Sequence, residues 1–182
     1  RYESVEKTKR LIRDKIRSFR YNPAESYFEF EVPESRGKKA SSWQVCTHGN
    51  LRWAASKEKE KWVVKPVNVT EGLKTLFEKH GISYEGGQDL ISSLCDQQQK
   101  DFFGALCNLL NLTLQLRYSN STAEGKDQDF ILSPVKNKEG KFFDSRLADG
   151  SLPQDADANG AYHIALKGLF HIKSEADKIN KK

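Results

Sequence analysis

One long amphipathic segment, residues 100–117, constrains the fold of this chain more than any other part of the sequence. Its apolar residues recur at helical spacing and form a wide stripe on one face. The stripe consists of Phe102, Phe103, Leu106, Leu109, Leu110, Thr113 and Leu116. Because a helix of this kind is stable mainly through the packing of its apolar face, the chain must build a core around it. Arg117 is predicted to close this helix.

Three shorter segments are predicted to be strands. Residues 27–32 place Phe28, Phe30 and Val32 on one face and two glutamates and Tyr27 on the other, with the period of two that a strand requires. Residues 42–47 and 62–64 have similar patterns, and a polar loop is expected at residues 56–61 between them. Three strands so close in sequence favour a small antiparallel sheet.

Further helices are predicted on both sides of these strands. They cover residues 4–19 with Ser4 as N-cap, residues 70–80 with Thr70 as N-cap, residues 90–94, and a final helix after Asp157 whose end, 174–182, should fray. Residues 130–132 are expected to be extended as far as Ser133-Pro134, and Gly140 and residues 144–146 are expected to lie in loop. The predicted class is α+β, a small antiparallel sheet packed with several helices.

Composition excludes several classes of protein. No apolar run approaches the roughly 20 residues that a membrane span needs, so a globular protein with no membrane association, located in the cytoplasm, is expected. The three cysteines, Cys46, Cys95 and Cys107, include no CxxC pair and are expected to be buried and reduced. Neither a GxSxG nor a glycine-rich phosphate-binding motif is present, and the spacing of His163 and His171 does not suit a metal site.

Charge is concentrated at the N-terminal end. Residues 1–20 carry eight basic and three acidic side chains, which accounts for the whole formal net charge of +5. A basic helix can follow the phosphates of a nucleic acid, although a solvated helix face explains the same pattern.

A second unusual stretch, residues 155–162, places Asp155 and Asp157 among small side chains at the expected start of the final helix. Aspartate is a preferred N-cap and suits the positive end of the helix dipole. Alternatively, one of these carboxylates binds a divalent cation, since hard cations prefer oxygen ligands.

Three motifs in the C-terminal part of the chain closely resemble the type V-A CRISPR RNA-guided nucleases, the Cas-twelve-a family. They are Phe130-Ile-Leu-Ser-Pro-Val135, Phe142-Phe-Asp-Ser-Arg146 and residues 152–168. Residues 1–9, 20–23 and 27–30 resemble the entry into the Nuc domain of that family, and residues 114–119 resemble its Nuc arginine segment. The resemblance covers nearly the whole chain.

The resemblance implies a piece of a larger endonuclease in which the Nuc domain is inserted into a split RuvC (RNase H-like) domain. Residues 1–154 would be the Nuc domain, and residues 155–182 would start the third RuvC segment with a C-terminal helix. The RuvC carboxylate aligns with Asp157, a catalytic ligand for Mg²⁺ or Mn²⁺ whose partner carboxylates lie upstream, so the metal site is expected to be incomplete and the isolated piece inactive. The implied partners are guide RNA, target DNA and the rest of the RuvC domain, in a prokaryotic cytoplasm.

Arg117 matches the arginine that the family associates with cutting the target strand, and a guanidinium can hold a phosphate bidentately. The residues alone would equally suit a helix cap. Asp129 matches an acidic Nuc position and would support Arg117, either through an ion pair or in catalysis. Further candidates for contact with DNA phosphates are Lys136, Lys138, Lys141 and Arg146, which can also be read as solvated loop charges.

The function expected from the resemblance is to position DNA strands for metal-dependent phosphodiester hydrolysis at the RuvC site, with Asp157 and Arg117 as its main residues. Two alternatives remain open. The chain could be a stand-alone nuclease centred on Arg117 and Asp129, or a non-catalytic module that binds nucleic acid or protein.

Overall fold

The computed structural model describes residues 5–33, 42–48, 51–58, 61–114, 117–118 and 130–179. They form two compact units, Arg1–Leu116 with Ser133–Phe142, and Arg117–Leu132 with Phe143–Lys182. The strand β7 (Phe130–Lys136) contributes its first half to the second unit and its second half to the first. The fold class, a mixture of helices and antiparallel strands, is confirmed.

The first unit is built on an antiparallel sheet. Its strands are β1 (Ser18–Asn22), β2 (Tyr27–Pro33), β3 (Ser42–Cys46) and the second half of β7. The register aligns Phe19 with Phe30 and Phe30 with Val45, so that apolar side chains from three strands share one face. The predicted alternation in β2 is therefore confirmed, because Phe28 and Phe30 are buried on this face.

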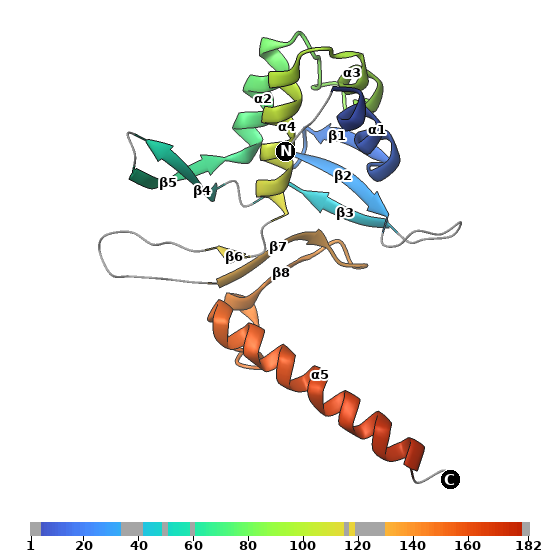
Figure 1. The fold of residues 1–182 in the computed structure, drawn as a ribbon, viewed down its shortest axis with the longest axis vertical. Coiled ribbons are helices and arrows are strands. Elements are labelled where there is room, and N and C mark those ends of the chain that lie inside the picture. The colour runs from blue at the N-terminus through green and yellow to red at the C-terminus, as the bar shows by residue number, and fades with distance from the viewer. Residues whose placement is uncertain are drawn as a thin grey trace. The chain divides into compact units, whose positions relative to one another are not determined.

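Four helices accompany this sheet: α1 (Val5–Lys15), α2 (Val69–Lys79), α3 (Ile91–Asp96) and α4 (Lys100–Thr113). Figure 1 shows α2 and α4 side by side and α1 beside α3. The core lies between the helices and the sheet, and its fully buried hydrophobic side chains are Phe19, Phe28, Phe77, Phe102, Phe103, Leu73, Leu90, Leu94, Leu106, Val45 and Val69. The apolar stripe of α4 thus packs in the core, as its spacing predicts.

The first helix is shorter than predicted. It was expected over residues 4–19 but ends at Lys15. Phe19 lies in β1, where its ring stacks on that of Phe30 with the centroids 5.5 Å apart. The apolar residues keep a helical spacing by chance as far as Phe19. The backbone there is nevertheless extended, because it pairs with β2. The expected N-cap Ser4 lies outside the described residues.

The N-cap of α2 is Asn68 and not Thr70. The Asn68 side chain accepts a hydrogen bond of 3.1 Å from the Glu71 amide, which satisfies one of the free donors of the first turn. Thr70 is buried instead, and its hydroxyl lies 2.7 Å from that of Thr47. Gly81, with φ +66°, follows the end of α2 as expected.

A separate antiparallel ribbon corrects the predicted polar loop at residues 56–61. The strands β4 (Leu51–Glu58) and β5 (Lys61–Asn68) pair with each other along their full length. Pro66 pairs with Trp53 and does not end β5, because a two-stranded ribbon leaves each strand an outer edge where a missing amide donor is tolerated. Consequently the predicted strand at 62–64 exists, but outside the main sheet.

The second unit contains β6 (Arg117–Tyr118), the first half of β7, most of β8 (Phe142–Asp144), a 3₁₀ turn (Ser145–Leu147) and α5 (Ala156–Ile179). Asp144, which was expected in a loop, ends β8, while Ser145 and Arg146 lie in the 3₁₀ turn. Strand β7 continues through Pro134. Helix α5 runs to Ile179, so the fraying predicted from residue 174 is wrong. None of the helices in the described ranges is long and apolar enough to cross a membrane.

Tyr84 gives the first unit a pH-dependent stability. Its hydroxyl donates a 3.0 Å hydrogen bond to Glu78 Oε1, and burial together with this bond raises the pKa of Tyr84 to about 12 from its ordinary 10.0. Because the folded pKa is the higher one, the stabilisation is complete below pH 10 and is lost as the pH rises toward 12. We expect Tyr84→Phe to flatten the fall in unfolding free energy between pH 9 and 11.5, measured by urea titration.

The matched control is Tyr162→Phe, because Tyr162 is partly exposed on α5. Burial also raises the pKa of the Cys46 thiol to about 12, so part of the alkaline fall should persist in Tyr84→Phe. An unchanged pH profile in Tyr84→Phe would contradict the assignment.

Candidate functional site

Arg117 lies in a strand and does not end the long helix. Helix α4 stops at Thr113, whose hydroxyl donates to the Leu109 carbonyl at 2.9 Å, and Leu114 is its C-cap. Arg117 then pairs with Ile131 of β7, and Tyr118 pairs with Phe130. The prediction that Arg117 closes the helix is therefore wrong, because strand pairing holds its backbone beyond the helix end.

Asp129, the predicted partner of Arg117, lies outside the described residues. In the chain it directly precedes Phe130, which opens β7 opposite Tyr118. The suggested ion pair with Arg117, like a catalytic role for Asp129, stays a prediction.

The two aspartates at the start of α5 have different roles. Asp155 caps the helix, since its Oδ1 accepts from the Ala158 amide at 2.8 Å and its carbonyl accepts from the Asn159 amide at 2.9 Å. Asn159 is almost fully buried, and its Nδ2 donates to the Pro153 carbonyl at 2.9 Å. Asp157, one helical position after Ala156, is exposed. The capping interpretation thus belongs to Asp155, which leaves the side chain of Asp157 on the surface.

Ser145 joins the strand partner of Arg117 to the start of α5. Its hydroxyl accepts from the Ile131 amide at 3.0 Å and donates to the Gln154 carbonyl at 2.6 Å. Ile131 is the residue that pairs with Arg117, while Gln154 directly precedes the cap Asp155. This fully buried serine therefore connects the elements that carry Arg117 and Asp157 within the second unit. Sequence reasoning missed it, because one serine in a predicted loop carries no signal.

The four basic candidates for phosphate contact fall into two groups. Lys136 is 18% exposed in its side chain and lies 3.7 Å from Glu29, and Arg146 is held by Asp144, with its Nε 2.9 Å from Asp144 Oδ1. The neighbouring Tyr27, whose ring centroid is 5.2 Å from Lys136 Nζ, raises the pKa of Lys136, so this lysine keeps its charge. These two cations already have carboxylate partners.

Lys138 and Lys141 are exposed on the turn between β7 and β8. Asn137 organises this turn, because its Oδ1 accepts from the amides of Glu139 and Lys141 at 3.0 and 2.9 Å. Gly140, with φ +76°, supplies the left-handed conformation that the turn needs. The turn therefore presents two lysines to solvent from a defined backbone.

No metal site is complete in the part of the chain that the structure describes. Among those residues, no three His, Cys, Asp or Glu side chains come together where they could hold a metal ion. The residues present therefore do not fit the Mg²⁺ or Mn²⁺ site that the resemblance implies, and Asp157 could contribute only one carboxylate to it. Cys46 and Cys95 are poor sources of a thiolate ligand, since burial raises the pKa of both thiols.

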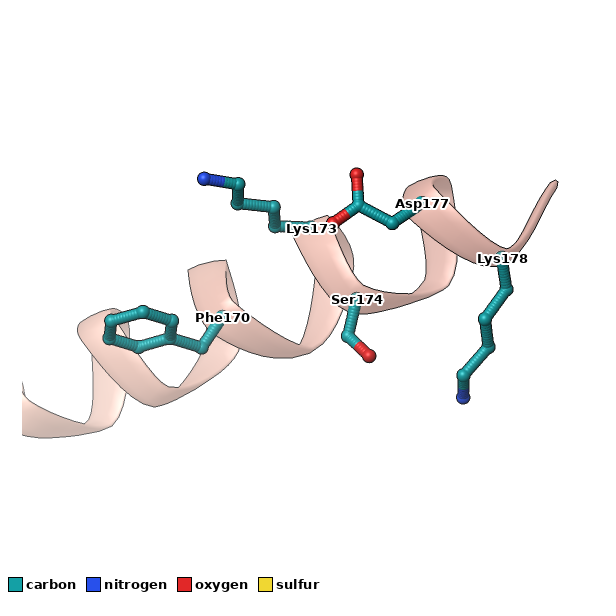
Figure 2. Close-up of a pocket in the computed structure, with 5 residues that line it drawn as sticks. All are labelled: Phe170, Lys173, Ser174, Asp177 and Lys178. Atoms are coloured by element: carbon teal, nitrogen blue, oxygen red, sulfur yellow. The ribbon is translucent and has the colours of Figure 1, made fainter. Parts of the chain in front are cut away.

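A shallow hollow lies along the C-terminal half of α5. Figure 2 shows its lining residues, Phe170, Lys173, Ser174, Asp177 and Lys178. All five come from one helix and their side chains point outward along it, so the hollow is open helix surface. It contains none of the predicted site residues and is not a candidate site.

A strand-held arginine, an exposed lysine turn and a surface carboxylate at a helix start are suited to a protein that handles phosphate groups. The family comparison agrees with this class, since the family of the nuclease domain (NUC) matches residues 1–147. The chain therefore belongs to the nuclease-domain family, which supports a nuclease role. All the predicted site residues except Asp157 lie within the matched range.

The Ser145 connection leads to a stability prediction. Ser145→Ala leaves the Ile131 amide and the Gln154 carbonyl without their partner, so we expect the unfolding free energy to fall by about 2 kcal/mol. Hydrogen exchange at the Ile131 amide should also become faster, which NMR measures. The control is Ser151→Ala, because the exposed Ser151 hydroxyl donates only to the Ala148 carbonyl. Equal effects of the two substitutions would show that Ser145 has no linking role.

Proposed function

We propose that this chain is part of an RNA-guided DNA endonuclease of the Cas-twelve-a type, in which it positions DNA strands for metal-dependent phosphodiester hydrolysis. The observation that carries the proposal is the nuclease-domain match over residues 1–147, which includes the segment around Arg117. The motifs that resemble the Cas-twelve-a family supply the finer assignment. Guide RNA and target DNA would be bound by the whole protein, in which base pairing reads the sequence.

In this proposal Arg117 holds a phosphate of the target strand. Pairing of Arg117 with Ile131 fixes its backbone in a strand, and a guanidinium can donate two parallel hydrogen bonds to a phosphate. Lys138 and Lys141, exposed on their turn in the first unit, would add unspecific attraction for a nucleic-acid backbone. Lys136 and Arg146 contribute less, since each already faces a carboxylate.

Asp157 would supply one carboxylate to the RuvC centre, and the other ligands would come from parts of the parent protein outside these 182 residues. Bound Mg²⁺ or Mn²⁺ activates water and stabilises the leaving oxygen in sites of this kind. The contribution of this chain is the placement of Asp157, through the Asp155 cap and the buried Asn159.

The exposed apolar side chains of α5 indicate that another part of the protein packs against this helix. Ile164, Leu169, Phe170 and Ile172 are each more than 60% exposed, an apolar surface that usually marks an interaction face. We propose that the rest of the RuvC domain covers it in the parent protein.

Arg117→Ala in the parent endonuclease tests the strand-positioning role. We expect the target strand to be cut more slowly than the other strand, by up to about 100-fold, because misplacing a reacting group by about 1 Å can cost this much. Nicked product should accumulate, and Arg117→Lys should restore the rate only partly, since lysine lacks the planar fork. Strand-resolved cleavage rates and a melting curve measure these effects. Equal slowing of both strands with a lower melting temperature would point to a structural role.

Asp157 and Asp155 form a matched pair for the metal-binding role. In the parent protein, Asp157→Ala should abolish cutting of both strands while guided DNA binding survives. Asp155→Ala should lower stability by about 1 kcal/mol through loss of the cap, and cutting should continue. Gel analysis of both strands, with binding measured separately, checks this.

Retained cutting of one strand in Asp157→Ala would indicate a second centre. Metal-dependent nicking of plasmid by the 182-residue chain alone, unchanged in Asp157→Ala, would favour the stand-alone nuclease of Arg117 and Asp129. The proposal expects no nicking, because one carboxylate cannot hold two hydrated metal ions.

A further inference from the structure

An exposed tryptophan lies at one end of the sheet in the first unit. Trp43 of β3 is 46% exposed, although Val45, two residues later on the same face, is buried in the core. The hydroxyl of the preceding residue, Ser42, accepts a 2.8 Å hydrogen bond from Arg17 Nη1. The Arg17 amide also donates to the Glu31 carbonyl at 2.9 Å. Arg17 is therefore fixed at the same end of the sheet as Trp43, through its backbone to Glu31 and through its side chain to Ser42.

Two further arginines, Arg10 and Arg13, lie on α1, shortly before Arg17 in the chain. Thr8, Ile12 and Ile16 form the buried side of this segment. Arg10 and Arg13, three residues apart, lie on the exposed side of α1, and Arg17 follows two residues after the end of the helix. The hydrogen bond from the Ile16 amide to the Ile12 carbonyl carries the helical geometry almost to Arg17. Two exposed arginines on α1 are thus followed by a third, whose guanidinium is bonded to Ser42 at the sheet end.

Among the described residues, the acidic neighbours of this surface leave it basic. Asp14 lies 3.6 Å from Arg10 with both side chains exposed, and Glu6 lies 3.7 Å from the buried Lys9. An exposed ion pair in water contributes little, so Arg10 can exchange Asp14 for a phosphate at small cost. Arg13 is exposed, and Arg17 is held by a neutral hydroxyl and not by a carboxylate.

We propose that Trp43, Arg10, Arg13 and Arg17 form a contact surface for a single-stranded segment of nucleic acid. An indole ring offers a stacking face to any unpaired base, whereas bases within a duplex are already stacked on one another. Neighbouring phosphates would lie on the arginines of α1. The inference rests on the proposed function, in that a nuclease must hold strands that have separated, and it adds a second contact surface to the one at Arg117.

Binding of a fluorescein-labelled single-stranded DNA oligonucleotide to the 182-residue chain tests the surface. Trp43→Ala should weaken binding at least about five-fold, while Trp43→Phe, which keeps a ring for stacking, should stay within about two-fold. Replacement of Arg10, Arg13 and Arg17 by alanine should reduce the slope of log affinity against log salt by about 2, since each phosphate contact on a single strand contributes roughly 0.7. A duplex of the same sequence should bind more weakly than the single strand.

The charge-matched control replaces Lys61, Lys79 and Lys100, three exposed lysines elsewhere in the first unit, by alanine. It should leave the salt slope closer to wild type than the arginine variant does. Circular dichroism melting of each variant confirms that it folds. Equal loss in the lysine and arginine variants, or unchanged binding by Trp43→Ala, would overturn the proposed surface.

The substitution of Lys138 and Lys141 by alanine separates this proposal from the proposed function. If it weakens binding while Trp43→Ala does not, the surface is wrong and the lysine turn remains a contact. If the wild-type chain binds no oligonucleotide even at low salt, the surface is overturned, and the strand-resolved cleavage assay on Arg117 still decides the proposed function.

Discussion

Contacts among phenylalanine rings hold the first unit together. Phe19 of β1 stacks on Phe30 of β2, and Phe77 of α2 packs edge-on against Phe28 with ring centroids 5.3 Å apart. Since these rings come from two strands and a helix, they fix the sheet register and the position of α2 together. Burying large aromatic side chains provides much of the stability of a domain of this size. Phe102 and Phe103 of α4 complete the same core.

The second unit depends on polar contacts instead. Ser145 is fully buried and bonds to Ile131 and Gln154, while Asn159 is fastened to Pro153. A buried hydroxyl or amide that finds its partners specifies one geometry, because leaving it unpaired is costly. Hydrogen bonds of this kind place the start of α5 in relation to β7 and β6 with few apolar contacts. This precision suits a unit that carries both Arg117 and Asp157.

The distribution of charge divides the functional surface in a comparable way. Lys136 and Arg146 lie against carboxylates, whereas Lys138, Lys141 and the arginines of α1 face solvent. In the sequence all of them look alike, as basic residues among polar neighbours. Their different uses follow from strand pairing, which puts Lys136 on the same face of the sheet as Glu29. A basic side chain is less available to a phosphate where the fold holds it against a largely buried carboxylate, as Glu29 and Asp144 are.

Local patterns determined the α+β class, the apolar face of β2, most of α2 to α4 and the existence of α5, because burial on one face imposes a period of two or about 3.6. They misplaced the ends of α1 and α4, since helical spacing cannot show where the backbone leaves the helix to pair with a distant strand. Phe19 pairs with a residue of β2, and Arg117 pairs with a residue of β7. The sequence motifs selected Arg117 and Asp157 as candidates. Only the tertiary structure showed that Asp155 caps α5, that β4 pairs with β5, and that Ser145 connects β7 to the start of α5. The reason is that individual hydrogen bonds leave no periodic signal in the sequence.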